Sequence, residues 1–277
     1  MPKSFGSKLQ AVFEAHGQLC VGIDPHASLL ESWGLPDNAE SLLEFSRAVI
    51  QASSGRVGIV KPQVSFFERH GAAGFAVLEA VTREARDAGL LVIADAKRGD
   101  IGTTMDAYLE AWLGRSAPFF ADSLTVSPYL GAGVYLDRMS DYFERGKGLF
   151  SLVATSNPEG ESVQLDLAKG QWEALSRVNQ VAAGPGDKLG SVGAVIGATL
   201  NLAKFKLELN GSEGVRTPIL APGFGAQGAE LSEIKRLFGE ASSTVLASVS
   251  RSILEAGPNG LAMAIENSKM QLEKGLA

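Results

Sequence analysis

Acidic and basic side chains alternate closely in the segment Ile93-Ala94-Asp95-Ala96-Lys97-Arg98-Gly99-Asp100. Residues two apart on a β-strand point to the same side, so Asp95 and Lys97 are expected to project together. Asp100 follows three residues later, in the loop before the next predicted helix. The simpler interpretation is an ordinary ion pair with Asp100 as a helix N-cap. The other is a site where a carboxylate orients an ammonium group for electrostatic or proton-transfer chemistry.

Other polar residues stand where further apolar runs of the chain end. They are Asp24, Lys61, Ser127, Gln227, Ser250 and Arg251. Lys61 would add a second ammonium group to the pocket that holds Asp95 and Lys97. Two lysines and two aspartates in one pocket are costly to desolvate unless they pair or take part in chemistry. Their gathering therefore favours a functional site over an isolated ion pair.

A second set of residues could hold a phosphate. The segment Gly223-Phe224-Gly225-Ala226-Gln227-Gly228 can bring backbone N–H groups close to an anion, with Gly225 and Gln227 at its centre. Ser250 and Arg251 follow the last apolar run, where a helix N-terminus would also favour negative charge. A tight turn beside a solvated arginine is the alternative. In barrels, phosphate often binds after strands seven and eight, which matches this position.

Eight short apolar runs must position these residues. They are 19–23, 57–60, 91–94, 120–126, 149–154, 192–196, 218–220 and 245–249. Nearly continuous apolar strands are typical of a parallel sheet that is buried on both faces. Segments with helical periodicity lie between them, so the sequence predicts an α/β fold, a single-domain (β/α)8 TIM barrel over residues 1–277. An open doubly wound sheet is the alternative, and in both folds ligands bind at the carboxyl ends of the strands.

Local signals predict where some helices begin. Ser41-x-x-Glu44 has the pattern of a capping box, and Thr103 or Thr104 could cap the helix that follows Asp100. The longest insert, residues 155–190, is expected to hold one helix and a mobile loop, because it contains the turn and break signals Asn157-Pro158-Glu159-Gly160 and Gly184-Pro185-Gly186.

Composition excludes several classes of protein. The 277 residues include 25 Lys and Arg against 31 Asp and Glu, a formal net charge of −6, which argues against a polyanion-binding surface. The single cysteine, Cys20, cannot form an internal disulfide. Apolar runs are far shorter than the roughly 20 residues that span a bilayer. A globular, cytoplasmic protein is therefore expected.

These motifs together resemble the orotidine 5'-monophosphate decarboxylase family. The resemblance rests on Asp95-x-Lys97-x-x-Asp100-Ile101, Lys61, the segment 221–228 and Ser250-Arg251-Ser252-Ile253, in the same order. It spans nearly the whole chain. The contexts Lys61-Pro62-Gln63 and Ser127-Pro128-Tyr129 are similar to those of the longer bacterial subgroup.

The resemblance implies decarboxylation of orotidine 5'-monophosphate to uridine 5'-monophosphate, the last step of de novo pyrimidine nucleotide synthesis. It implies a homodimer in which each site is completed by the partner chain, with no metal or organic cofactor. The implied catalytic tetrad is Lys61, Asp95, Lys97 and, from the other subunit, Asp100. Lys97 would stabilise the carbanion and donate the proton.

The resemblance also implies the groups that bind the substrate. Asp24 would hold ribose hydroxyls, with Thr104 of the partner subunit nearby. Ser127 would contact the pyrimidine amide edge. Gln227 and Arg251 would hold the phosphate, with Ser250 and Gly225 beside them.

Two alternative functions remain compatible with the pattern. The first is a Mg²⁺-dependent sugar-phosphate decarboxylase or epimerase on the same barrel, whose acidic residues would bind the metal. Two lysines in the mouth weigh against it. The second is a non-catalytic barrel that binds pyrimidine nucleotides, which would have no need of the tetrad.

Overall fold

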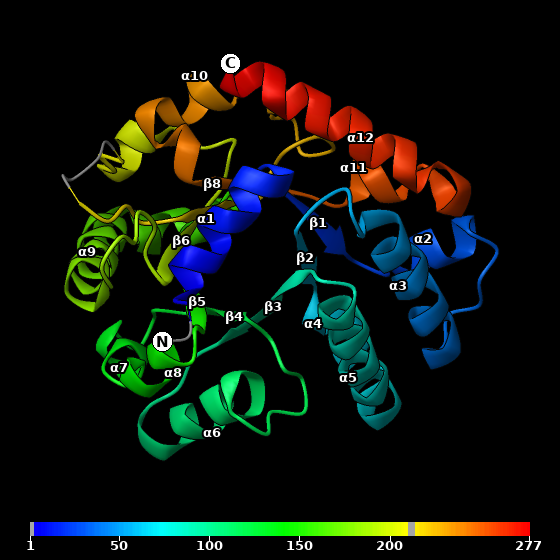
Figure 1. Cartoon of the computed structure of the whole chain (residues 1–277), viewed down its shortest axis with the longest axis horizontal. Helices are drawn as coiled ribbons and strands as arrows, with labels where there is room; N and C mark the ends of the chain where they lie inside the picture. Colours follow the sequence, from blue (N-terminus) through cyan, green and yellow to red (C-terminus); the bar gives the residue numbers. More distant parts are fainter. Residues whose placement is uncertain (1–2, 210–213) are drawn as a thin grey trace.

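The computed structural model describes residues 3–209 and 214–277, and its eight parallel strands form a closed barrel in chain order (Figure 1). The strands are β1 (Leu19–Ile23), β2 (Ile59–Pro62), β3 (Leu91–Arg98), β4 (Ser123–Val126), β5 (Gly148–Ala154), β6 (Val192–Ile196), β7 (Ile219–Ala221) and β8 (Val245–Val249). β1 pairs with β8, so the sheet has no free edge. This closure confirms the predicted (β/α)8 barrel and excludes the open sheet.

Helices surround the strands, apart from α1, which crosses the middle of the view in Figure 1. The α-helices are α1 (Phe5–His16), α2 (Ala27–Ser32), α3 (Ala39–Ser53), α4 (Val64–Glu68), α5 (Gly71–Asp87), α6 (Gly102–Leu113), α7 (Gly133–Leu136), α8 (Ser140–Glu144), α9 (Pro158–Ala182), α10 (Ile234–Phe238), α11 (Arg251–Leu254) and α12 (Gly257–Leu276). Three 3₁₀ helices, η1 (Leu202–Phe205), η2 (Leu231–Glu233) and η3 (Gly239–Thr244), complete the connections. Within the described residues, no helix combines the length and the apolarity that crossing a membrane requires.

Helix α1 closes the amino-terminal end of the barrel. The side chains of Phe5 and Leu9 are fully buried there, and the Phe5 ring meets Phe150 of β5 edge-on with 6.1 Å between centroids. Lys8 Nζ donates a hydrogen bond of 2.9 Å to the Gly146 carbonyl oxygen, just before β5. The opposite, carboxyl-terminal end is therefore where a ligand can enter.

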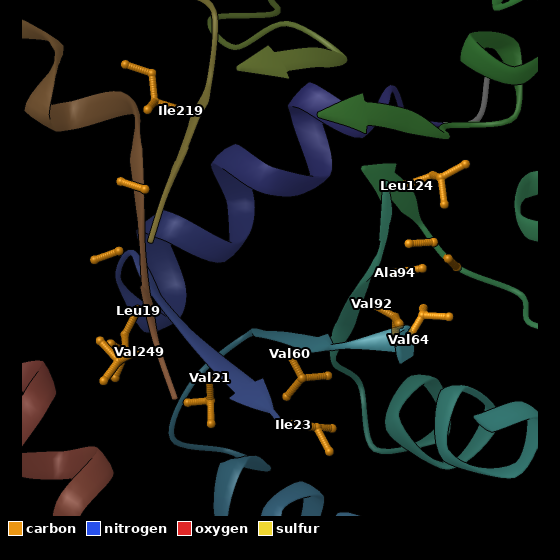
Figure 2. Packing of buried hydrophobic residues seen from close by; sticks show 14 of the residues in the cluster. Leu19, Val21, Ile23, Val60, Val64, Val92, Ala94, Leu124, Ile219 and Val249 are labelled. Atoms are coloured by element: carbon orange, nitrogen blue, oxygen red, sulfur yellow. The ribbon is translucent and has the colours of Figure 1, made fainter. Parts of the chain in front are cut away.

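The apolar strands separate two layers of core. Alternate residues of each strand point outward against the helices, and Figure 2 shows Val21, Ile23 and Val60 pointing away from α1 in this way. The intervening residues, such as Cys20, fill the inside of the barrel with Phe5 and Leu9. Burial of both faces accounts for the continuous apolar runs, because each fully buried aliphatic side chain contributes about 1.5–3 kcal/mol.

Some predicted strand boundaries were wrong. β3 continues through Arg98 instead of ending at Ala94, and β2 runs over Ile59–Pro62 instead of 57–60. β4 begins at Ser123, three residues later than predicted, because Phe120 has a left-handed backbone with φ of 39°. That conformation cannot continue a strand. The Phe120 ring is instead held by cation–π contacts with Arg86 and Lys147.

Two predicted helix starts also differ from the structure. Asn38, not Ser41, caps α3, and its side chain accepts a 2.9 Å hydrogen bond from the Ser41 backbone N–H. Helix α6 begins at Gly102, so Thr103 and Thr104 lie inside its first turn and cap nothing. The insert over residues 155–190 does hold one helix, α9.

Candidate active site

A cavity of about 520 Å³ lies at the carboxyl ends of the strands. Its floor includes Leu152 of β5, Val195 of β6 and Leu220 of β7. Seven of the eleven residues proposed from the sequence line it: Asp24, Lys61, Asp95, Lys97, Gln227, Ser250 and Arg251. Parallel strand order brings them together, because residues from distant parts of the chain end at one rim.

The Asp95 carboxylate lies at the centre of a network of four donors. Lys61 Nζ is 3.0 Å and Gln63 Nε2 is 3.2 Å from its Oδ2 atom. Lys97 Nζ is 2.6 Å and Thr125 Oγ1 is 2.9 Å from its Oδ1 atom. Two ammonium groups and two neutral donors therefore surround one buried carboxylate, which satisfies both oxygens.

Opposite charges keep this buried group of side chains ionised. Burial alone raises the pKa of Asp95, but the Lys61 and Lys97 ammonium groups outweigh burial and hold that pKa well below its ordinary value. Burial likewise lowers the pKa of Lys61, and the carboxylates of Asp95 and Asp24 outweigh it, so the pKa is raised above its ordinary value. Both residues are charged across the neutral pH range.

The two lysines differ in their access to the cavity. The Lys61 side chain is 6% exposed, whereas that of Lys97 is 44% exposed and faces the open space. Lys97 also has a left-handed backbone, with φ of 50°. It lies in an irregular stretch where the register between β3 and β4 shifts. Lys97 is therefore the ammonium group with the more open access to a bound ligand. Lys61 is the more buried partner of the Asp95 carboxylate.

Asp24 presents an unsatisfied acceptor beside Lys61. Its Oδ1 atom is buried and has no hydrogen-bond partner within the described residues. A Cβ atom at Gly22 would lie 1.8 Å from Ser250 Oγ and 3.2 Å from Asp24 Oδ1, so glycine makes room for both side chains. A buried carboxylate oxygen without a partner is costly, and a ligand hydroxyl would satisfy it.

The other side of the cavity combines Gln227 with Arg251. Helix α11, which begins at Arg251, has only four residues, so positive charge there comes from the guanidinium group more than from a helix dipole. Gly225, which was predicted beside the phosphate, does not line this cavity. Its N–H already donates to the Ala229 carbonyl oxygen at 2.8 Å, and its φ of 71° makes it a turn residue.

Three further predicted residues lie outside the cavity of their own chain. Asp100 accepts a 2.8 Å hydrogen bond from the Ile101 backbone N–H, and Thr104 is exposed on α6. Ser127 does not line the cavity either, and its backbone N–H donates to the Arg98 carbonyl oxygen. Ser156, which follows β5, does line the cavity, as do Ser248 and Ser250.

Sequence reasoning missed several residues of the cavity wall. They are His26, Gln63, Thr155, Ser156, Asn157 and Gln164, together with Thr125 beneath the wall. The Thr155 backbone N–H donates to Gln164 Oε1 at 2.7 Å, which ties the loop to α9. A sequence signal for the residues after β5 was present, because polar residues follow this strand directly, as they follow other strands. The segment 155–160 was interpreted only as a turn.

Breaking the buried ion pair tests this arrangement. Lys61→Met is expected to lower the free energy of unfolding at pH 7 by about 3 kcal/mol, because it removes one of the two ammonium groups that compensate the buried Asp95 carboxylate. The Asp95 pKa is depressed by its lysines, so its stabilising effect is present above the unfolded pKa of about 4 and is lost as pH falls from there through the much lower folded pKa. In Lys61→Met the buried carboxylate lacks one ammonium group, so its pKa rises and it is protonated more readily at pH 4. The loss of stability in Lys61→Met should therefore be smaller at pH 4 than at pH 7.

Urea unfolding at both pH values measures this difference. Lys97→Met is the matched control, since its more exposed ammonium group should cost less than half as much stability. Equal losses for the two variants, or a Lys61→Met loss that grows at pH 4, would contradict the assignment of Lys61 as the buried support.

Comparison with known proteins places this geometry in a family. Residues 17–264 match the model of the orotidine 5'-phosphate decarboxylase / HUMPS family. An orotidine 5'-phosphate decarboxylase of Streptomyces coelicolor is 47% identical over 274 residues, covering 97% of this chain and 96% of the relative. The enzyme of that name from Salinispora tropica is 45% identical, covering 94% and 93%.

Solved structures agree with the sequence relatives. The crystal structure of a protein from Streptomyces avermitilis described as a putative orotidine 5'-phosphate decarboxylase is 44% identical. It superposes with a TM-score of 0.91 over 100% of this chain and 98% of that one. The OMP decarboxylase of Leishmania donovani is 28% identical, with a TM-score of 0.76 over 99% and 100% of the two chains. The chain therefore belongs to the orotidine 5'-phosphate decarboxylase / HUMPS family.

Proposed function

We propose that this protein is an orotidine 5'-monophosphate decarboxylase that forms uridine 5'-monophosphate and carbon dioxide. The observation that carries the proposal is the Lys97 ammonium group, which faces the cavity 2.6 Å from the buried Asp95 carboxylate. The similarity to relatives of that name over nearly the whole chain supports the same activity. This reaction, catalysed by a carboxy-lyase, is the last step of de novo pyrimidine nucleotide synthesis.

The chemical difficulty is the carbanion left at carbon 6 of the pyrimidine. When the bond to the carboxylate breaks, its electron pair stays on the ring and carbon dioxide leaves. Lys97 Nζ stabilises that charge as it develops and then transfers one proton to carbon 6. A cation already oriented by Asp95 needs little reorganisation at that moment. The fixed charge of Asp95, held by four donors, would face the departing carboxylate and destabilise the ground state.

The remaining residues of the cavity would hold the nucleotide. The free Oδ1 atom of Asp24 accepts a ribose hydroxyl, and Arg251 with Gln227 binds the phosphate. Ser250 shares with Asp24 the space beside Gly22, and Gly225 shapes the turn that carries Gln227. We assign the pyrimidine contact to Ser156 instead of Ser127, because only Ser156 lines the cavity.

We further propose that the active unit is a homodimer. Asp100 and Thr104 lie outside their own cavity and would complete the site of the facing protomer. Apolar side chains are exposed on the loops after β3 and β4: Ile101 is 61% exposed and Tyr129 is 76% exposed. Large exposed apolar side chains next to polar groups are typical of a surface that a second subunit covers.

We also propose that the protein has a single domain and is located in the cytoplasm. Residues 1–277 would form a single domain, because the strands that close the barrel come from the first and last thirds of the chain. In segment 155–190, the loop before α9 (155–157) lines the cavity and remains the predicted mobile element, whereas the loop after α9 bonds to Ser4 beside α1 through Asp187. The lone cysteine, Cys20, is buried and unpaired, which favours the cytoplasm over an oxidising compartment.

A spectroscopic assay with chelator tests the function. Orotidine 5'-monophosphate added to the protein with excess EDTA should show a change in the ultraviolet absorbance of its pyrimidine, with one carbon dioxide released per nucleotide. Activity that EDTA abolishes would favour the metal-dependent sugar-phosphate alternative. Two ammonium groups within 3.0 Å of Asp95 oppose that alternative, because they repel a divalent cation. Nucleotide binding without turnover would favour the non-catalytic barrel.

Removing the phosphate contact should slow turnover as well as weaken binding. Arg251→Ala is expected to lower kcat/KM for the nucleotide by about 100-fold, since a charge-assisted hydrogen bond contributes about 1.5–3 kcal/mol. Binding energy at the phosphate can also drive closure around the reacting ring. Initial rates over a range of substrate concentrations separate kcat from KM.

The nucleoside orotidine is the matched control substrate, because it lacks the phosphate. Its much slower reaction should be the same in Arg251→Ala and in the unaltered protein. Arg177→Ala, on the exposed face of α9, controls for loss of a surface charge. If the variant lost equal activity toward nucleotide and nucleoside, Arg251 would not be the phosphate ligand.

A further inference from the structure

We propose that Thr125 is a positioning residue for the proton-donating lysine. Its hydroxyl group fixes the strained backbone of Lys97 to the carboxylate of Asp95. The inference rests on the proposed function and adds to it a residue that does not touch the substrate.

Lys97 adopts a conformation that few side chains accept. Its φ of 50° lies in the left-handed region, which among the described non-glycine residues it shares only with Phe120 and Lys206. Such a conformation costs of the order of 1–3 kcal/mol and persists only where neighbouring groups hold it. At Lys97, therefore, something must hold the backbone in place.

The pairing of β3 with β4 shows why the strain arises there. Ala94 pairs with Leu124, yet Arg98 pairs with Val126, so β3 advances four residues while β4 advances two. The surplus residues of β3 form a bulge, and Thr125 is the single residue of β4 opposite it. Bulges redirect side chains near active sites. This one contains Asp95 and Lys97, which both line the cavity.

Thr125 bonds to both sides of that bulge. Its Oγ1 atom accepts a hydrogen bond of 2.9 Å from the Lys97 backbone N–H and donates one of 2.9 Å to Asp95 Oδ1. The directions are fixed, because an amide N–H can only donate and an ionised carboxylate can only accept. The residue is 1% exposed, so no water competes. One hydroxyl group thus couples the backbone of the proton donor to the carboxylate that orients its ammonium group.

Loss of the hydroxyl should misplace Lys97 without affecting the groups that bind the nucleotide. Thr125→Val keeps the shape of the side chain and removes both hydrogen bonds. We expect kcat to fall by about 10- to 100-fold, since displacement of a reacting group by about 1 Å can cost 100-fold. KM and the affinity for uridine 5'-monophosphate should change by less than about 3-fold, because Asp24 and Arg251 are untouched.

Ser123→Ala is the matched control on the same strand. Ser123 is also fully buried and lies two residues away, on the same side of β4, but its Oγ atom has no hydrogen-bond partner within the described residues. Its removal should leave kcat unchanged. Thr125→Ser retains the hydroxyl group and should restore most of the lost activity. If Thr125→Val does not fold, Thr125→Ala carries the same comparison.

A second measurement reports on proton transfer by Lys97 alone, without the loss of the carboxylate. Lys97 should exchange the carbon 6 hydrogen of uridine 5'-monophosphate for deuterium from solvent, by the reverse of its protonation step. Thr125→Val should slow this exchange in proportion to kcat, and Thr125→Ser should restore it. A kcat within 2-fold of the unaltered protein, or a serine variant as impaired as the valine variant, would overturn the inference. Inactivity of the unaltered protein would instead overturn the proposed function.

Discussion

Lys97→Ala is expected to abolish decarboxylation almost completely while the barrel stays folded. The variant loses the only ammonium group of the tetrad with open access to the cavity, since Lys61 is nearly buried beneath Asp95. General acid catalysis contributes about 10²–10⁴-fold and one electrostatic contact a further 10²–10³-fold, so a loss of at least about 10⁴-fold in kcat is expected. The change in pyrimidine absorbance, followed for hours at high enzyme concentration, measures it.

Binding distinguishes loss of chemistry from loss of structure. Lys97→Ala should still bind uridine 5'-monophosphate with an affinity within about 10-fold of the unaltered protein, by calorimetry, because the ribose and phosphate contacts remain. Lys169→Ala, on the exposed face of α9, should have full activity. Residual activity above about 1% in Lys97→Ala would remove Lys97 from the role of proton donor.

A second large loss of activity is expected from a residue that would complete the site of the facing subunit. Asp100→Asn is expected to be nearly inactive, although Asp100 lies outside the cavity of its own chain. Coexpression with Lys97→Ala should then restore activity, because the mixed dimer contains one site with Lys97 from one chain and Asp100 from the other. Random pairing makes half of the dimers mixed and half of their sites intact, so about a quarter of the unaltered activity should return.

The pair Lys97→Ala and Asp95→Asn provides the control for this experiment. Both residues belong to the same cavity and touch each other at 2.6 Å, so every site of the mixed dimer keeps one defect. No activity should return. Restoration by this pair, or none by the first pair, would rule out a site shared between protomers. Affinity tags of two kinds allow the mixed dimers to be isolated before assay.

The architecture could be predicted because a parallel barrel leaves a regular trace in the chain. Strands buried on both faces are nearly continuous apolar runs, so β1, β6 and β8 were located to the residue. Boundaries failed where local geometry departs from the regular pattern. The last residues of β3 are polar, so the apolar pattern did not indicate that the strand continues through the bulge. The left-handed backbone of Phe120 makes β4 begin later than its apolar run.

The charged centre of the site could be predicted for the same reason. Asp24, Lys61 and Lys97 each follow or end a strand, and closure of the barrel brings strand ends together. The supporting residues could not. The contacts of Thr125 with Lys97 depend on a register shift that no spacing reveals, and Gln63 reaches Asp95 only across a neighbouring strand.

The positions of Ser127 outside the cavity and of Ser156 in its wall have a similar explanation. Ser127 and Ser156 both follow strands, and the choice between them depends on the direction in which each loop leaves the barrel. The loop after β4 bonds back to β3 through the Ser127 N–H, whereas the loop after β5 is tied to α9 by Gln164. Loop direction is a tertiary property, and polar residues at the end of a strand do not specify it.

The docking of α1 has a consequence for synthesis on the ribosome. This helix emerges before all eight strands, yet Lys8 bonds to a carbonyl group 138 residues away, and Ser4 bonds to Asp187, 183 residues away. At about 5–20 residues per second, the nascent helix waits about 10–40 s for its partners. During that interval Phe5 and Leu9 have no native surface to cover them. Newly made chains should therefore depend on chaperones most strongly before residue 187 has left the exit tunnel.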